Sequence, residues 1–137
     1  MSTQAVALVD WGTSNLRVWL VDAAANVLSE CQSPEGMGTL SPDRFAGVLE
    51  RHLSALDADP DLPVVVAGMA GARAGWIEAP YVETPAGLTD LNLKAVAAPG
   101  TDRDVRILPG VCQRTSGAED VMRGEETQLL GAVASGL

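Results

Sequence analysis

Three apolar segments separated by short polar turns occupy the first part of the chain and predict three adjacent β-strands. Residues 5–9 are apolar without alternation, a pattern typical of a central strand covered on both faces, and the strand is predicted over residues 5–10. Residues 15–22 alternate, with Leu16 and Leu20 on the apolar side, so this strand is expected to have one buried face. Residues 26–32 form the third strand. The short turns predict that the three make an antiparallel meander.

The pattern then changes to that of an amphipathic helix over residues 41–57. Ser41 followed by Pro42 is a typical helix start, with a capping hydroxyl and proline at the first helical position. Five apolar residues recur at helical spacing and are expected to face the core: Phe45, Val48, Leu49, Leu53 and Leu56. Residues 63–67 are a short, fully apolar strand that is predicted to join the meander in parallel, and residues 105–108 form another strand. Meander, helix and strand in this order match half of an RNase H-like domain.

Composition narrows the class of protein. The 137 residues suit one domain with a sizeable core. A net charge of −9 argues against a nucleic-acid or anionic-membrane partner, since both need basic patches. Cys31 and Cys112 form no CxxC motif, which indicates neither a disulfide framework nor a zinc site and fits a reducing cytoplasm. No apolar run approaches the roughly 18 residues of a membrane span. The one histidine, His52, is expected on the helix surface, which leaves little from which to build a Ser-His-Asp site.

The turn after the first strand carries candidate phosphate chemistry. The strand ends at Asp10, whose carboxylate can hold a hydrated Mg²⁺. Gly12 lets the backbone approach a phosphate, and the neighbouring side chains and turn amides can donate hydrogen bonds to its oxygens. The residues expected to bind phosphate are Gly12, Thr13, Ser14 and Asn15. The alternative is a plain hairpin with an Asx-type turn.

Three segments in order carry a family resemblance: DWGTSNLR from residue 10, AGMAGARAGW from residue 67 and MRGEETQ from residue 122. Together they resemble the 2-dehydro-3-deoxygalactonokinase family, within the sugar kinase and actin-like ATPase superfamily. The resemblance implies an α/β, RNase H-like N-terminal domain over residues 1–137, with a mixed sheet, an antiparallel three-strand meander and flanking helices. The family's second, C-terminal kinase domain, with another phosphate loop and the adenosine pocket, is not found in this chain.

This resemblance implies a reaction and its cofactors. ATP with Mg²⁺ would phosphorylate 2-dehydro-3-deoxy-D-galactonate to its 6-phosphate, as a step of galactonate degradation in the cytoplasm. Asp10 would position the metal. Arg17, just beyond the turn, is equally well interpreted as a substrate or phosphate ligand and as a surface residue on the polar face of its strand.

The glycine-rich segment of residues 68–76 resembles the family's sugar-acid-binding loop. Its spacing, G-x-x-G-x-x-x-G, is not the dinucleotide-binding fingerprint. The backbone at Gly68 and Gly71 could approach a carboxylate or hydroxyl, and Arg73 could pair with a carboxylate. Trp76 could pack on the sugar carbons. Alternatively, the segment is a flexible connection and Trp76 belongs to the core.

Glu125 and Glu126 follow Gly124 at the predicted start of a helix that runs to the end of the chain. Met122 and Leu129 bracket Glu126 on the apolar side of that helix, where a carboxylate is costly unless it meets a cleft, a metal or a partner. The resemblance implies that one of the two glutamates accepts the proton of the attacking hydroxyl. The alternative is that both are helix-start acids favoured by the macrodipole.

A function of a different class is also compatible with the sequence. The chain could be a non-catalytic module with an actin-like nucleotide fold that associates with a partner chain or with itself through its exposed inter-domain face. On either interpretation we expect the 137-residue chain alone to have no kinase activity.

Overall fold

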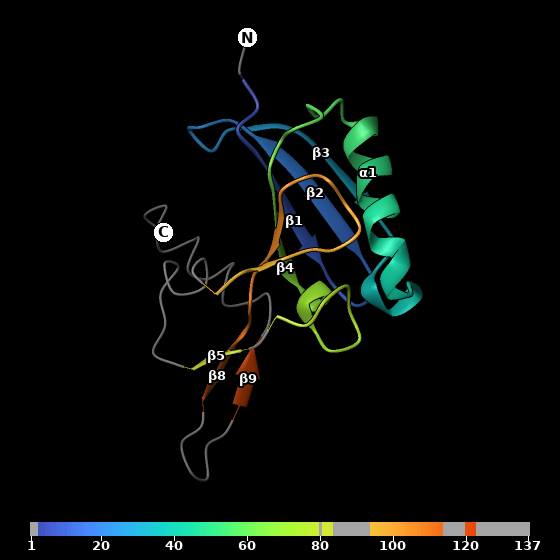
Figure 1. Cartoon of the computed structure of the whole chain (residues 1–137). Helices are drawn as coiled ribbons and strands as arrows, with labels where there is room; N and C mark the ends of the chain where they lie inside the picture. The colour runs from blue at the N-terminus through green and yellow to red at the C-terminus, as the bar shows by residue number, and fades with distance from the viewer. Residues whose placement is uncertain (1–2, 80, 84–93, 114–119, 123–137) are drawn as a thin grey trace.

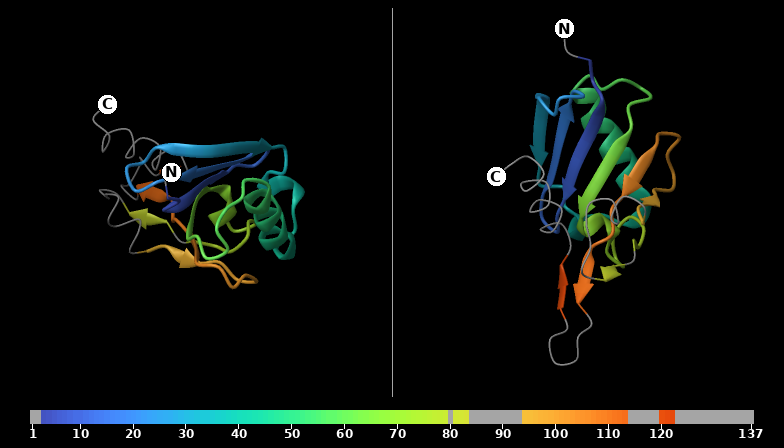
Figure 2. Two further views of the ribbon diagram at one scale, coloured as in Figure 1. Left: turned by 90° about the horizontal axis from the view of Figure 1, so that it is seen from above. Right: turned by 90° about the vertical axis from the view of Figure 1, so that its left-hand side faces the viewer.

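A six-stranded mixed sheet forms the centre of the structure, a computed structural model that describes residues 3–79, 81–83, 94–113 and 120–122 (Figure 1). The strand order is β3-β2-β1-β4-β7-β6. These strands are β1 (Val6–Trp11), β2 (Leu16–Val21), β3 (Val27–Ser33), β4 (Val64–Gly68), β6 (Val96–Ala97) and β7 (Val105–Ile107). A smaller sheet of β5 (Val82–Glu83), β8 (Val111–Gln113) and β9 (Asp120–Met122) extends beyond the end of the main sheet (Figure 2).

The predicted strand pairings are confirmed. β1 pairs with β2, and β2 with β3, in antiparallel register, so the first three strands form the expected meander. β4 joins β1 in parallel, which the long connection through a helix between β3 and β4 allows, and β7 joins β4 in parallel. β6 pairs antiparallel with β7 and forms one edge of the sheet.

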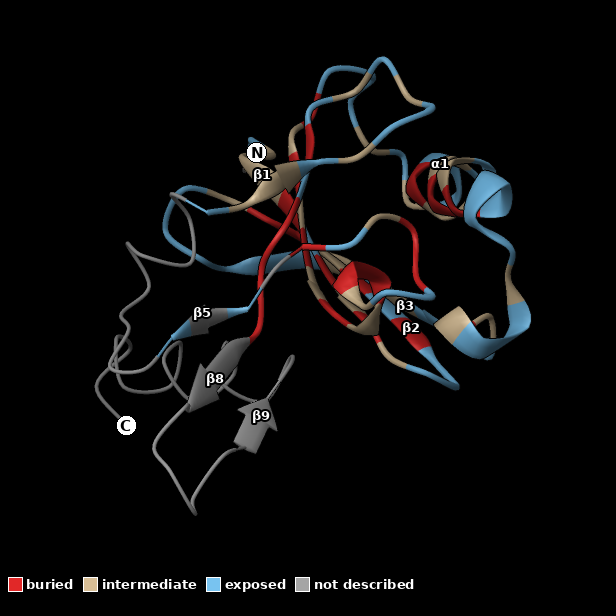
Figure 3. Ribbon diagram, turned by 60° about the horizontal axis from the view of Figure 1, so that its bottom comes forward, coloured by how far each residue is buried: buried red, intermediate tan, exposed pale blue. Residues whose placement is uncertain are grey.

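Helix α1 (Phe45–Ala55) covers one face of the sheet and turns its buried side toward it (Figure 3). Four of the five apolar residues predicted to face the core are buried, and Leu56 packs partly buried at the helix end. The predicted helix start is wrong: Pro42–Arg44 is a 3₁₀ turn, and the α-helix begins at Phe45. The Ser41 hydroxyl donates to Asp43 Oδ1 at 2.6 Å, and its oxygen caps no backbone N–H.

The other face of β1 departs from the prediction of a strand covered on both sides. Ala7, Val9 and Trp11 are buried toward α1, whereas Leu8, on the opposite face, is 40% exposed. In β2 the predicted alternation holds up to Leu20. An irregularity in its pairing with β3 between Leu20 and Val21 accompanies burial of both residues.

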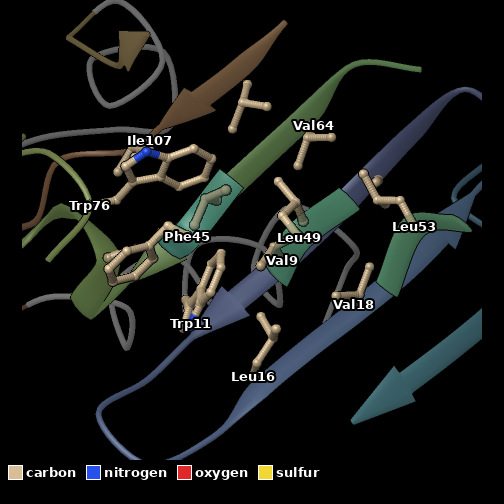
Figure 4. Packing of buried hydrophobic residues seen from close by; sticks show 14 of the residues in the cluster. Val9, Trp11, Leu16, Val18, Phe45, Leu49, Leu53, Val64, Trp76 and Ile107 are labelled. Carbon is tan, nitrogen blue, oxygen red and sulfur yellow. The ribbon is translucent and has the colours of Figure 1, made fainter. Parts of the chain in front are cut away.

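Three aromatic rings close the core at the end of β1 (Figure 4). Phe45 contacts both of the others: its ring centroid lies 4.8 Å from that of Trp11, and it stacks on Trp76 at 5.8 Å. Trp11 and Trp76 meet edge to face at 6.0 Å. All three are at most 4% exposed, so this cluster fixes the end of β1 against both α1 and the segment after β4.

None of the helices in the described part of the chain has the length and apolar character needed to cross a membrane.

Candidate phosphate site at the ends of β1 and β4

Two glycine-containing loops meet where β1 and β4 end. The parallel register places Asp10 beside Ala67 and Trp11 beside Gly68. Gly68 has φ +97°, and a Cβ there would lie 2.7 Å from the Trp11 carbonyl oxygen and 3.1 Å from Asp10 Oδ1. Both the backbone conformation and the space therefore require glycine, which lets the second loop lie directly against Asp10.

The turn that follows Asp10 presents polar groups to solvent. Gly12 N–H donates to the Asn15 carbonyl at 2.8 Å and closes the turn. Thr13, Ser14 and Asn15 are all exposed. Two hydroxyls and an amide are thus gathered within a few residues of a half-buried carboxylate, as the sequence predicts for a phosphate-binding turn.

Asp10 and Arg17 are direct cross-strand partners on the sheet face away from α1. Arg17 is exposed; its Nη2 lies 3.5 Å from Gln32 Oε1, and its guanidinium lies 6.0 Å from the Trp19 ring centroid. The structure therefore places a cation beside the candidate metal ligand, and it also places Arg17 on the polar face of its strand. Both interpretations of Arg17 remain compatible with this position.

A segment far from the turn in sequence lies directly against it. We call residues 35–39 the strap. Met37 N–H donates to the Gly12 carbonyl at 2.8 Å, and Gly38 N–H donates to the Thr13 carbonyl at 2.9 Å. The sequence analysis did not identify these residues as part of the site. The available signal was the pair of glycines at Gly36 and Gly38, two residues apart in a loop without hydrophobic periodicity.

The Glu35 carboxylate ties the strap to β3 and α1. Glu35 Oε1 accepts from the Ser33 hydroxyl at 2.7 Å and from His52 Nε2 at 2.8 Å, and it also pairs with the Arg51 guanidinium. The hydrogen bonds from Ser33, Arg51 and His52 lower the pKa of Glu35 to about 2. The carboxyl group is therefore ionised at neutral pH and holds three donors.

The expectation that His52 is a surface residue is wrong, because its side chain is only 16% exposed. A carboxylate only accepts hydrogen bonds, so His52 Nε2 carries the proton directed at Glu35. Nδ1 faces Cys31 Sγ at 3.8 Å, and burial raises the pKa of that thiol. His52 thus links the strap to α1.

The loop after β4 is held by its own backbone. Ala72 N–H donates to the Met69 carbonyl at 3.0 Å, and Trp76 N–H donates to the Ala70 carbonyl at 2.8 Å. A Cβ at Gly75 would lie 2.4 Å from the Ala70 carbonyl oxygen, so this fold of the loop depends on glycine there. Gly71 is buried, and its carbonyl accepts from Ala79 N–H at 2.9 Å.

Of the two interpretations of Trp76, the structure supports the core residue. The ring is 4% exposed, and its indole N–H donates to the Pro99 carbonyl at 3.1 Å. Packing on the sugar carbons would require an accessible ring face, and the ring is almost fully buried. Arg73, in contrast, is exposed and lies in the part of the loop that reaches solvent.

The predicted catalytic pair, Glu125 and Glu126, lies outside the described residues. One argument for the pair needs correction. Met122 belongs to strand β9, so it cannot mark the phase of a helix that contains Glu126. The expected phase then rests on residues further along the chain, which also lie outside the described part.

Among the described residues, no group of three or more His, Cys, Asp or Glu side chains could hold a metal ion. A magnesium site needs less than this, because Mg²⁺ keeps several waters and takes one or two carboxylates together with substrate phosphates. The half-buried Asp10 carboxylate, beside a turn of exposed hydroxyls, fits such a site.

The structure is thus an α/β domain in which an aspartate and a hydroxyl-bearing turn lie at the end of β1, beside the end of β4. These features define its class as an α/β domain with a candidate phosphate-binding site. The sequence profile of the family described as 2-keto-3-deoxy-galactonokinase matches residues 10–137, and the chain belongs to this family.

Relatives of this chain support that placement. It is 53% identical over 128 residues to a protein provisionally named 2-dehydro-3-deoxygalactonokinase DgoK1 from Rhizobium meliloti (strain 1021), covering 93% of this chain and 42% of that protein. It is 36% identical over 126 residues to 2-dehydro-3-deoxygalactonokinase from Escherichia coli (strain K12), covering 92% and 41% respectively. A crystal structure of a protein provisionally described as a 2-dehydro-3-deoxygalactonokinase from Sinorhizobium meliloti matches with TM-score 0.88 and 52% identity, over 95% of this chain and 43% of that one. The chain therefore spans about two fifths of the length of these relatives.

Proposed function

We propose that the protein acts as a sugar-acid kinase that transfers the γ-phosphoryl group of ATP to 2-dehydro-3-deoxy-D-galactonate and forms the 6-phosphate. The observation that carries this proposal is the family match over residues 10–137, which includes Asp10 and the turn after it. We also propose that the domain belongs to the RNase H-like class and that the enzyme acts in the cytoplasm. The proposed reaction involves neither a nucleic acid nor a membrane.

The described residues would bind and orient the phosphates. Asp10 would hold Mg²⁺, which supplies charge neutralisation to the phosphates when bound. The turn of residues 12–15 would donate hydrogen bonds to phosphate oxygens. Arg17 and Arg73, both exposed, are candidates to pair with the sugar-acid carboxylate. Phosphoryl transfer depends mainly on such positioning and electrostatic stabilisation.

The backbone at Gly68 and Gly71 would contact the bound sugar acid, and the buried side chain of Trp76 would hold this loop to the core. Glu125 or Glu126 would accept the proton of the attacking hydroxyl. We propose that residues 1–137 supply one wall of a cleft and that a second kinase domain supplies the adenosine pocket. This chain covers 42% of the length of the relative from Rhizobium meliloti, which supports the division of the enzyme into two such domains.

The direct test is an assay of the full-length protein encoded by the gene, with ATP, Mg²⁺ and 2-dehydro-3-deoxy-D-galactonate. We expect ADP release together with a product heavier by one phosphoryl group. Residues 1–137 alone should give no product above background. Absence of product from the full-length protein with this sugar acid, under conditions where it is folded, would contradict the proposed function.

A further inference from the structure

We propose that the strap, residues 35–39, is a positioning element that holds the phosphate-binding turn in the shape that receives the phosphates of ATP. Glu35 and Gly36 are its key residues. This inference rests on the proposed function, since it assigns ATP phosphates to the turn. It adds a segment that neither the family resemblance nor the glycine pattern of the turn identifies.

The first observation is that backbone hydrogen bonds join the strap to the turn. The carbonyl groups of Gly12 and Thr13 each accept one strap N–H, at 2.8 Å and 2.9 Å. Both carbonyl oxygens are thereby directed at the strap. The hydroxyls and the remaining N–H groups of the turn would then be the groups that meet phosphate oxygens, which is the polarity an anion site needs.

The second observation is that Gly36 fits where no side chain can. A Cβ at this position would lie 2.4 Å from the Thr13 carbonyl oxygen and 2.5 Å from the Asn15 nitrogen. Gly36 has φ −73° and ψ 171°, a conformation open to any residue. Glycine is therefore required here by space, because the backbone of the turn passes directly over it.

The third observation is that the strap is fixed at its start. The Glu35 carbonyl accepts the Trp11 indole N–H at 2.9 Å, and the Glu35 carboxylate holds His52 at 2.8 Å. Trp11 belongs to the buried aromatic cluster and His52 to α1. Through Glu35 the strap is thus held to both the core and the helix. It adds two backbone hydrogen bonds to a turn that is also held by its own closing hydrogen bond and by the flanking pair Trp11 and Leu16.

A graded glycine series tests the inference in the full-length enzyme. A Cβ at Gly38 would lie 3.1 Å from the Thr13 carbonyl oxygen, a milder contact than at Gly36, and a Cβ at Gly47 on α1 would meet nothing within 4 Å. Gly36→Ala should raise the KM for ATP about tenfold or more, because displacements of about 1 Å have effects of this size or larger. Gly38→Ala should raise it less, and Gly47→Ala not at all. The KM for the sugar acid should stay within about twofold in all three.

Glu35→Gln provides a second test, because it adds no side-chain atom at the close contact between Gly36 and the turn. It should raise the KM for ATP by a few fold, with the KM for the sugar acid unchanged. If Gly36→Ala fails to fold, Gly38→Ala and Glu35→Gln carry the test. An unchanged KM for ATP in these variants, with an active wild type, would overturn the role of the strap and leave the proposed function intact.

ATP binding by calorimetry separates the two proposals. If the wild type binds ATP but does not phosphorylate the sugar acid, the proposed substrate is wrong, and the same variant order in Kd would still support the strap. If the wild type binds no ATP, both proposals are wrong.

Discussion

The two loops at the carboxyl ends of β1 and β4 are held in place in opposite ways. The turn of residues 12–15 is exposed and is braced from outside by the strap. The loop of residues 68–76 folds on itself, with internal backbone hydrogen bonds and Trp76 inserted into the core. The first loop is supported by a segment more than 20 residues away, whereas the second is supported by its own backbone hydrogen bonds and by the packing of its tryptophan in the core.

This difference predicts where mutations act. Changes in the loop after β4 should act first on folding, because its glycines and its tryptophan are part of the packing. Changes in the turn or strap should act first on ligand binding, because few buried apolar contacts depend on them. The following predictions test the contrast, from the largest expected effect to the smallest.

Trp76→Ala should have the largest effect on stability. It removes a ring that stacks on Phe45 and meets Trp11, and losses of buried aromatic side chains cost about 3–5 kcal/mol. Urea unfolding followed by circular dichroism measures this cost. Trp76→Phe is the matched control and should recover part of it. A loss below about 1 kcal/mol for Trp76→Ala would show that the loop is not held by the core.

Gly75→Ala should destabilise the protein by about 2–3 kcal/mol, because the added Cβ would meet carbonyl oxygens of the backbone, which cannot move aside like a flexible side chain. Gly47→Ala is the control: it fills open space on α1 and should stabilise by up to about 1 kcal/mol. Equal thermal unfolding midpoints for the two variants would break the claim that the loop is self-supporting.

Glu35→Gln should have a smaller, pH-dependent effect. The pKa of Glu35 is about 2 in the folded protein against an ordinary value of 4.5, so the contribution of this carboxylate to stability is complete above pH 4.5 and is lost as the pH falls toward 2. We expect the variant to be less stable than wild type by about 1 kcal/mol at pH 7, with the difference shrinking below pH 4.5. Glu78→Gln, at an exposed position, should show neither effect. A constant difference from pH 7 to pH 2 would contradict the assignment.

Arg73→Ala should have the smallest effect on stability, within about 0.5 kcal/mol, because the side chain is exposed. In the full-length enzyme it should instead raise the KM for the sugar acid. Arg44→Ala, another exposed arginine, should change neither quantity. A melting temperature lowered by several degrees in Arg73→Ala would show that Arg73 supports the loop.

Hydrophobic periodicity was sufficient to predict the meander, the parallel strand at β4 and the buried face of α1, because each depends on local pattern. It could not predict the strap, whose contacts join backbone groups that carry no hydrophobic signal. It also placed His52 on the helix surface, because the partner that holds the ring in its half-buried position, Glu35, lies in a loop 17 residues earlier. The predicted helix start at Ser41 was wrong, because Pro42–Arg44 forms a 3₁₀ turn before the α-helix begins at Phe45.

The interpretation of Trp76 shows a related limit. Tryptophan in a glycine-rich loop is compatible with both a ligand contact and a core anchor, and the sequence analysis favoured the ligand contact. Only the positions of Phe45 and Trp11, from α1 and β1, decide between them. Tertiary packing of this kind is set by topology, which a local pattern does not contain.

The most direct test of the central claim is the turnover of Asp10→Asn in the full-length enzyme, with Asp61→Asn, at an exposed position, as the control. The account predicts a loss of at least about 100-fold in kcat at saturating Mg²⁺ and ATP, since charge neutralisation at the phosphates is central to the transfer. The melting temperature should stay close to that of wild type, and Asp61→Asn should keep full activity. Near-normal turnover of Asp10→Asn would contradict the assignment of the phosphate and metal site to the end of β1.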